Sequence, residues 1–89
     1  MTRRYLVIYE NGPENMSGFA PDVPGCASTG HSLDEMRTSL REALEFHLEG
    51  LALDGQPPPP AITRVAEVPE DGFAEWLSVT LPVAEVISA

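Results

Sequence analysis

The chain has 89 residues and a net charge of −9 at pH 7, with fourteen acidic residues, five arginines and no lysine. This length allows one domain with a small core, and self-association would add buried surface to it, so we expect a homo-oligomer. The negative charge favours a basic protein over nucleic acid as a partner. No apolar run is long enough to span a membrane, no signal peptide opens the sequence, and the single Cys26 forms no disulfide within the chain, so we expect a cytoplasmic protein.

The first third of the sequence predicts three antiparallel strands. Residues 3–10 are rich in β-branched and aromatic side chains and end at the turn former Asn11-Gly12-Pro13. Residues 16–21 and 25–29 are the second and third predicted strands. Between them, Pro24-Gly25 is typical of a type II turn, because proline sets the first central φ and glycine accepts the positive φ of the second.

A long amphipathic helix is predicted over residues 32–54. Ser32 and Glu35 have the spacing of a capping box, in which the Ser32 hydroxyl accepts a hydrogen bond from the Glu35 amide. Side chains at the i, i+3, i+4 spacing of a core-facing stripe follow: Leu33, Met36, Leu40, Ala43, Leu44, His47, Leu48 and Leu51. Gly55 suits the left-handed position that follows a helix.

The last third of the sequence predicts one more strand. Residues 56–61 include four consecutive prolines and form a stiff connector from the helix back to the sheet. Residues 75–81 alternate with period two and are the best candidate for the fourth strand. Residues 83–88 either continue an edge strand or exchange with another chain. The predicted fold is α+β, with the order β-β-β-α-β and one long helix packed on one face of an antiparallel sheet.

Two stretches of the sequence resemble the HicB-like antitoxin family. The first is Phe19-Ala20-Pro21-Asp22-Val23-Pro24-Gly25-Cys26, followed by Thr29-Gly30-His31-Ser32-Leu33-Asp34-Glu35. The second is His47-Leu48-Glu49-Gly50-Leu51-Ala52-Leu53-Asp54-Gly55-Gln56-Pro57, at the predicted helix end. The resemblance implies a partial ribonuclease H-like domain without enzyme activity. Its implied partner is a HicA toxin, a small basic protein that cleaves messenger RNA with a histidine and that the antitoxin neutralises.

This chain departs from the family pattern at two points. Many HicB antitoxins carry a further C-terminal DNA-binding module, whereas no basic helical segment follows the fourth predicted strand here. We therefore expect no direct binding of nucleic acid. Met36 stands where the family more often has a small residue, so we expect the packing of the helix on the sheet to differ there.

A metal-dependent nuclease is one alternative that the acidic residues leave open. Ribonuclease H-type catalysis needs several carboxylates around two metal ions, and Glu10 and Asp22 are candidate remnants, with Asp34 or Glu35 at the helix start. However, Asp22 precedes a turn whose next amides its carboxylate can accept, and an acid at a helix N-terminus is normally a cap. We expect no catalytic residue, and we expect the turn residues to define the fold rather than a site: Asp22, Pro24, Gly25 and Cys26.

Cys26, His31 and His47 are the remaining candidate metal ligands or nucleophiles. They share no short-range spacing typical of a metal site. We interpret Cys26 as a small buried residue on the third strand and His47 as a mostly buried, hydrogen-bonded residue of the apolar helix face. The sequence therefore predicts no metal and no cofactor.

Phe46 lies off the apolar helix face, on the side it shares with Gly50 and Leu53 at about 100° per residue. Glu42 and Glu49 belong to the same polar side. An exposed phenylalanine beside a glycine, which allows close approach, indicates a contact surface for a toxin or for a second copy in a dimer or tetramer. The alternative is that the last strand or the C-terminal tail covers it. A stand-alone oligomeric interaction module with an unknown ligand is a further interpretation.

Overall fold

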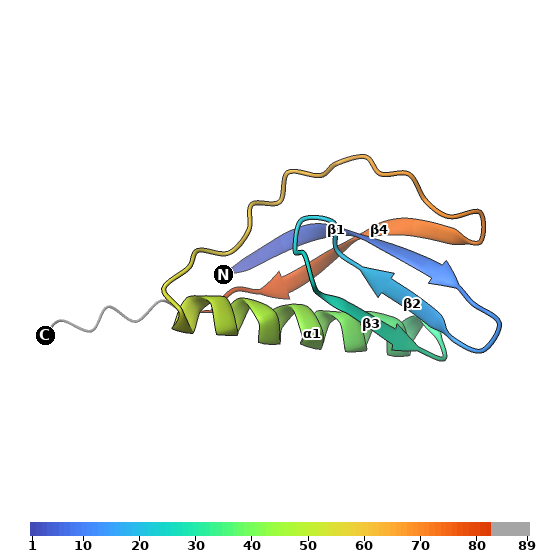
Figure 1. Cartoon of the computed structure of the whole chain (residues 1–89), viewed down its shortest axis with the longest axis horizontal. Helices are drawn as coiled ribbons and strands as arrows, with labels where there is room; N and C mark the ends of the chain where they lie inside the picture. The colour runs from blue at the N-terminus through green and yellow to red at the C-terminus, as the bar shows by residue number, and fades with distance from the viewer. Residues whose placement is uncertain (83–89) are drawn as a thin grey trace, which may run out of the picture.

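The computed structural model describes residues 1–82, which form one four-stranded antiparallel sheet with a helix against it (Figure 1). The elements follow the chain as β1 (Thr2–Asn11), β2 (Met16–Phe19), β3 (Ala27–Gly30), α1 (Leu33–Leu53) and β4 (Gly72–Thr80). The strands lie in the order β3-β2-β1-β4, and each neighbouring pair is antiparallel. The predicted α+β class and element order are confirmed. The edge continuation or exchanged tail predicted for residues 83–88 lies outside the described residues.

β1 is an inner strand, and both of its faces are covered. All residues from Tyr5 to Tyr9 are buried, which explains why this stretch is a continuous apolar run rather than an alternation. Because successive side chains of a strand point to opposite faces, Tyr5, Val7 and Tyr9 pack toward α1, while Leu6 and Ile8 point to the other face. The sheet therefore has a second partly closed face opposite the helix.

Local signals at both ends determine where α1 begins and ends. Ser32 has an extended backbone, and its hydroxyl accepts a hydrogen bond from the Glu35 amide at 3.2 Å, as the capping box predicts. At the other end, Gly55 has a φ of 73°, and its amide and that of the next residue donate back into the last turn at 3.0 and 2.8 Å. This is a Schellman motif, which satisfies the last carbonyl groups of the helix.

One stripe of α1 packs against the sheet. Its fully buried residues recur every four positions, at Met36, Leu40, Leu44 and Leu48. Burying a side chain of this size contributes roughly 1.5–3 kcal/mol, so this stripe is the main attachment of the helix. His47, which we expected to be mostly buried, is partly buried at the margin of the stripe.

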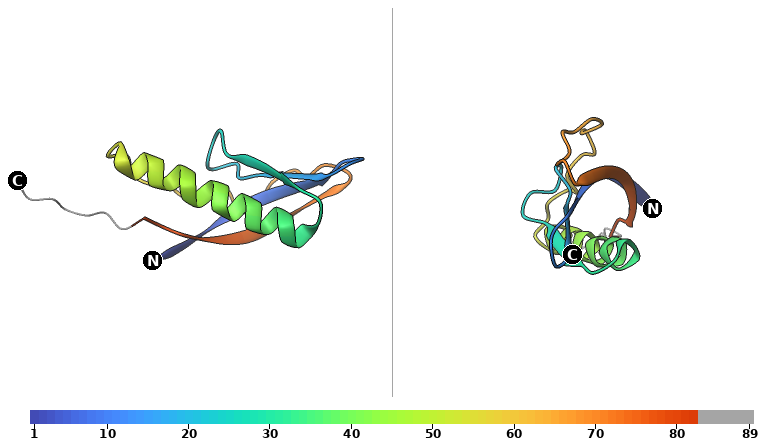
Figure 2. Two further views of the ribbon diagram at one scale, coloured as in Figure 1. Left: turned by 90° about the horizontal axis from the view of Figure 1, so that it is seen from below. Right: turned by 90° about the vertical axis from the view of Figure 1, so that its right-hand side faces the viewer.

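The connector between α1 and β4 crosses the side of the sheet opposite the helix (Figures 1 and 2). It has no regular secondary structure, as its prolines predict. Near its start, the Pro59 carbonyl accepts hydrogen bonds from Arg3 Nη1 at 2.9 Å and from the Tyr5 hydroxyl at 2.6 Å.

Among the described residues, no helix is both long and apolar enough to cross a membrane.

Several strand boundaries differ from the prediction. β4 begins at Gly72, earlier than the predicted strand 75–81, because Phe73 packs its ring on Tyr9 with the centroids 5.1 Å apart and extends the pairing with β1. Cys26 precedes β3 instead of belonging to it. Its amide donates to the Val23 carbonyl at 3.3 Å and so closes the turn.

Candidate functional site

The turn between β2 and β3 has the predicted type II geometry. Gly25 has a φ of 82°, and the bond from the Cys26 amide to the Val23 carbonyl spans the Pro-Gly pair. An L side chain at Gly25 would be strained although no other atom lies within 4 Å of its Cβ position. β2 ends at Phe19, short of the predicted residue 21, because the Ala20 carbonyl already accepts the Val23 amide at 3.1 Å.

Asp22 joins this turn to the connector. Its Oδ2 accepts the Thr63 amide at 2.9 Å, and its Oδ1 accepts the Thr63 hydroxyl at 2.6 Å. The prediction that the carboxylate accepts the amides of the next residues is therefore wrong, because the connector passes the turn and supplies both donors. Thr63 is the single hydroxyl-bearing residue between Ser39 and Ser78, and this is the one signal by which the sequence marked it.

The candidate catalytic and metal-binding side chains are dispersed. Glu10 is exposed at the end of β1, Asp34 and Glu35 are exposed at the start of α1, His31 is exposed and Cys26 is buried. Within residues 1–82, no three His, Cys, Asp or Glu side chains are placed to hold a metal ion. Burial raises the pKa of the Cys26 thiol, which keeps it protonated and fits a small core residue.

A second surface of interest is the side of α1 opposite the buried stripe, which we call the outer helix face. Phe46 and Leu53 are 79% and 87% exposed there. Glu42, Glu49 and Gly50 are exposed with them, and a Cβ at Gly50 would meet no atom within 4 Å. In Figure 1 this is the lower side of the helix, away from the sheet. β4 pairs with β1 and leaves Phe46 open, so the interpretation in which the last strand covers Phe46 is wrong. The C-terminal tail, the other part of that alternative, lies outside the described residues.

A polar cluster that the sequence did not indicate joins α1 to β4. Arg37 donates from Nε and Nη2 to the two carboxylate oxygens of Glu75, both at 2.8 Å, and the Tyr9 hydroxyl donates to Glu75 Oε1 at 2.8 Å. The hydrogen bonds from Arg37 hold the pKa of Glu75 below its ordinary value, and burial raises the pKa of Tyr9. A bidentate arginine–carboxylate pair has a preferred geometry, so it orients α1 on the sheet.

Comparison with protein families extends the resemblance seen at the turn and at the helix end. A family model described as the HicB-like antitoxin of bacterial toxin–antitoxin systems matches residues 5–87. The chain belongs to the HicB-like antitoxin family. The match takes in the sheet, the helix and the connector, so the family resemblance is confirmed over much more of the chain than the two stretches that first indicated it.

Two relatives of this HicB-like chain match it over about half of its length. A 14.9 kDa protein of the rep–hol intergenic region of Haemophilus phage HP1 (strain HP1c1) is 46% identical over 52 residues, or 58% of this chain and 39% of the phage protein. The UPF0150 protein of Thermotoga maritima is 45% identical over 47 residues, or 51% of this chain and 63% of that protein. The matched part is thus less than two thirds of either relative.

Solved HicB structures share the fold. The N-terminal domain of the Burkholderia pseudomallei antitoxin HicB is 26% identical with a TM-score of 0.67, covering 91% of this chain and 100% of that domain. A chain of the HicA3 and HicB3 toxin–antitoxin complex has a TM-score of 0.69 at 21% identity, covering 88% of this chain and 99% of that chain. The Burkholderia pseudomallei antitoxin HicB has a TM-score of 0.68 at 23% identity, with 98% of this chain and 75% of that one covered.

Proposed function

We propose that this HicB-like chain binds a small basic HicA-like toxin and masks the surface with which the toxin cleaves RNA. The observation that carries the proposal is the family match over residues 5–87, together with a net charge of −9 that favours a basic partner. The shared fold with a chain of the HicA3 and HicB3 complex supports it. The chain acts by covering that surface of the toxin and catalyses no reaction. It does so as one domain within a homo-oligomer in the cytoplasm, where messenger RNA lies.

We assign the toxin contact to the outer helix face. Phe46 is an exposed aromatic side chain beside the open surface at Gly50, and such aromatic anchors contribute most of the affinity at protein interfaces. Glu42 and Glu49 flank it, and charges at the rim of an interface speed encounter and select a partner of opposite sign. This face therefore combines an apolar centre with an acidic border.

Phe46→Asp tests the assigned face, with Val65→Asp as the matched control. Val65 is also an exposed apolar residue, 89% exposed on the connector. In calorimetric titrations with a small basic HicA-like toxin, Phe46→Asp should weaken binding about tenfold or more, which corresponds to the loss of one aromatic anchor. Val65→Asp should bind as the unmodified chain does. The reverse order of effects would place the contact on the connector side of the molecule.

The antitoxin role itself depends on the partner. The unmodified chain should co-purify with the small basic protein, and rising salt should weaken the complex because it screens opposite charges. If the neighbouring genes encode no such protein and none co-purifies, the proposal fails. Cleavage of RNA by this chain alone with a divalent metal would instead favour the nuclease alternative.

A further inference from the structure

The free edge of β4 carries backbone groups without a partner. β4 lies at one edge of the sheet and is nine residues long, whereas β3 at the other edge has four. In an antiparallel strand, the N–H and C=O of one residue point to one side and those of the next residue to the other. The Leu81 amide donates to the Met1 carbonyl at 3.0 Å, and the Asn11 amide donates to the Asp71 carbonyl at 2.9 Å. The backbone groups of the odd-numbered residues therefore bond toward β1. The backbone N–H and C=O groups of the even-numbered residues of β4 therefore point away from β1, toward the open edge of the sheet.

The chain itself occupies the two ends of this edge. The outward groups bonded within the chain are the Ser78 carbonyl (to Arg41 Nε, 3.0 Å), the Thr80 amide (to Glu45 Oε2, 2.6 Å) and the Gly72 amide (to the Pro69 carbonyl, 3.0 Å). Between them, the amides and carbonyls of Ala74 and Trp76 have no hydrogen-bond partner in residues 1–82. Unpaired donors and acceptors in a row along an edge are a template for another strand.

The charges beside the middle of this edge are mixed, whereas the chain as a whole is strongly acidic. Arg37 pairs with Glu75 on β4, and Arg4 of β1 lies over the Trp76 ring. Arg41 and Glu45 of α1 bond to the Ser78 carbonyl and the Thr80 amide. Acidic residues border the other end of the edge, with Asp71 directly before β4 and Glu10 opposite Gly72. Repulsion between two copies of this acidic chain is therefore weakest at the middle of β4, where the arginines lie. The edge therefore fits a second copy better than a strongly basic partner.

We propose that two copies of this chain join their sheets by pairing β4 with β4 in antiparallel orientation, about a two-fold axis at Glu75. In this register, Ala74 lies opposite Trp76 of the second copy, and each such pair exchanges both of its backbone hydrogen bonds. The Ser78 amide lies opposite the free carbonyl of Gly72. The groups left over, the Gly72 amide and the Ser78 carbonyl, are the ones already bonded within each chain.

Neighbouring registers fit less well. With Trp76 opposite itself, the Ala74 amide would meet the Ser78 carbonyl, which Arg41 already occupies. With Ala74 opposite itself, the Trp76 carbonyl would meet the Gly72 amide, which is bonded to the connector. The bonds inside one chain thus select the register between two.

The side chains of the proposed join are compatible with it. Trp76 is 42% exposed on the outer side of the sheet and would lie opposite the small Ala74, so that two indole rings do not collide. On the helix side, the two Glu75 residues meet near the axis, where like charges opposite each other destabilise a strand pair. Each carboxylate already accepts two hydrogen bonds from its own Arg37 and one from Tyr9, so it enters the join as a neutralised pair.

Ala74→Pro tests the contact without disturbing the bonds between β4 and β1. Proline is tolerated on an edge strand where the N–H faces outward, and here it would remove one outward donor and place a ring in the join. Ala74→Val is the control, because it keeps the amide and favours a strand. By sedimentation velocity over a concentration series, the unmodified chain and Ala74→Val should approach twice the mass of 9.6 kDa, whereas Ala74→Pro should stay at 9.6 kDa.

Native-state hydrogen exchange provides a second readout that needs no variant. The amides of Ala74 and Trp76 should exchange rapidly in dilute protein and become protected as the concentration rises. Added salt should strengthen the self-association, because it screens the repulsion between two acidic chains, although it weakens a complex with a basic toxin. The proposal is overturned if the unmodified chain is a monomer at millimolar concentration or if the Ala74→Pro variant remains a dimer. Dissociation of the dimer by Phe46→Asp but not by Ala74→Pro would place the contact on the outer helix face instead.

Discussion

Asp22→Ala removes the link between the turn and the connector. The carboxylate accepts the amide and the hydroxyl of Thr63 at 2.9 and 2.6 Å, and both residues are half-buried. A hydrogen bond to a charged group contributes about 1.5–3 kcal/mol, and partial exposure reduces this toward the lower limit. We therefore expect the free energy of unfolding to fall by about 2–3 kcal/mol when both bonds are lost.

Thr63→Val divides this effect between the two bonds. The valine keeps the backbone amide and loses only the hydroxyl donor, so it should cost about 1–1.5 kcal/mol. In the Asp22→Ala background the same change should cost little, because the acceptor is already absent. Urea unfolding followed by the fluorescence of the single Trp76 measures all four proteins, at one protein concentration because self-association adds to apparent stability. A loss below about 0.5 kcal/mol for Asp22→Ala, or additive effects of the two changes, would refute the reasoning.

Acid should weaken the Arg37–Glu75 pair, because the folded state lowers the pKa of Glu75. The contribution of the pair to the free energy of unfolding is complete above the ordinary glutamate pKa and is lost as the pH falls through the pKa of the folded state. Glu75→Gln should flatten the acid limb of thermal melts recorded against pH, and an unchanged limb would contradict the assignment. Gly30→Ala should destabilise by about 1–3 kcal/mol, because its methyl group would lie 2.8 Å from the Met36 amide nitrogen. Gly50→Ala is the matched control, since its methyl meets nothing within 4 Å and should stabilise the helix by about 0.5–1 kcal/mol in chemical denaturation; a similar loss in both variants would argue against the packing at Gly30.

Elements with local chemical signals could be predicted from the sequence. The helix follows from the Ser32 cap, the four-residue spacing of its buried leucines and the left-handed Gly55, all of which lie within a few residues of the bonds they form. The same holds for the type II turn at Gly25. Local patterns also place β1, because its apolar run is buried on both faces. They do not determine where β4 begins, since that depends on Phe73 finding Tyr9 across the sheet.

Long-range polar contacts could not be predicted in the same way. Asp22 and Thr63 are 41 positions apart, and Arg37 and Glu75 are 38 apart, so no spacing rule connects them. The sequence identified Asp22 as structural but assigned its hydrogen bonds to the wrong partners. It is the path of the connector that decides this, and a proline-rich run predicts stiffness without predicting direction.

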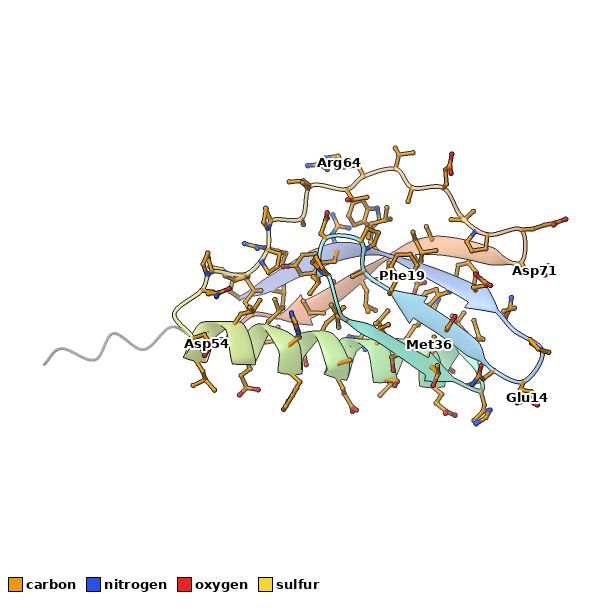
Figure 3. The ribbon with its side chains drawn as sticks, viewed as in Figure 1. Glu14, Phe19, Met36, Asp54, Arg64 and Asp71 are labelled. Atoms are coloured by element: carbon orange, nitrogen blue, oxygen red, sulfur yellow. The ribbon has the colours of Figure 1, made fainter. Side chains whose placement is uncertain are left out.

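The candidate contact surface was predictable in position but not in role. Helical periodicity places Phe46 away from the sheet, and the structure leaves its side chain 79% exposed. Figure 3 shows Met36 at the inner side of the same helix, Phe19 between the sheet and the arch of the connector, and Arg64 on that arch. Exposure on several surfaces does not itself identify a partner, so the assignment of toxin to the outer helix face stays a prediction. The free edge of β4 needed the hydrogen bonds of the folded chain, because only these distinguish occupied from unoccupied backbone groups.

Inhibition of RNA cleavage tests the antitoxin account most directly. A small basic HicA-like toxin is incubated with messenger RNA, and the amount of intact RNA is measured as this chain is added. We expect cleavage to stop near equimolar amounts of the two proteins, and we expect Phe46→Asp to require a large excess while Val65→Asp behaves as the unmodified chain. Continued cleavage at every ratio, in the presence of a chain that is shown to be folded, would contradict the account.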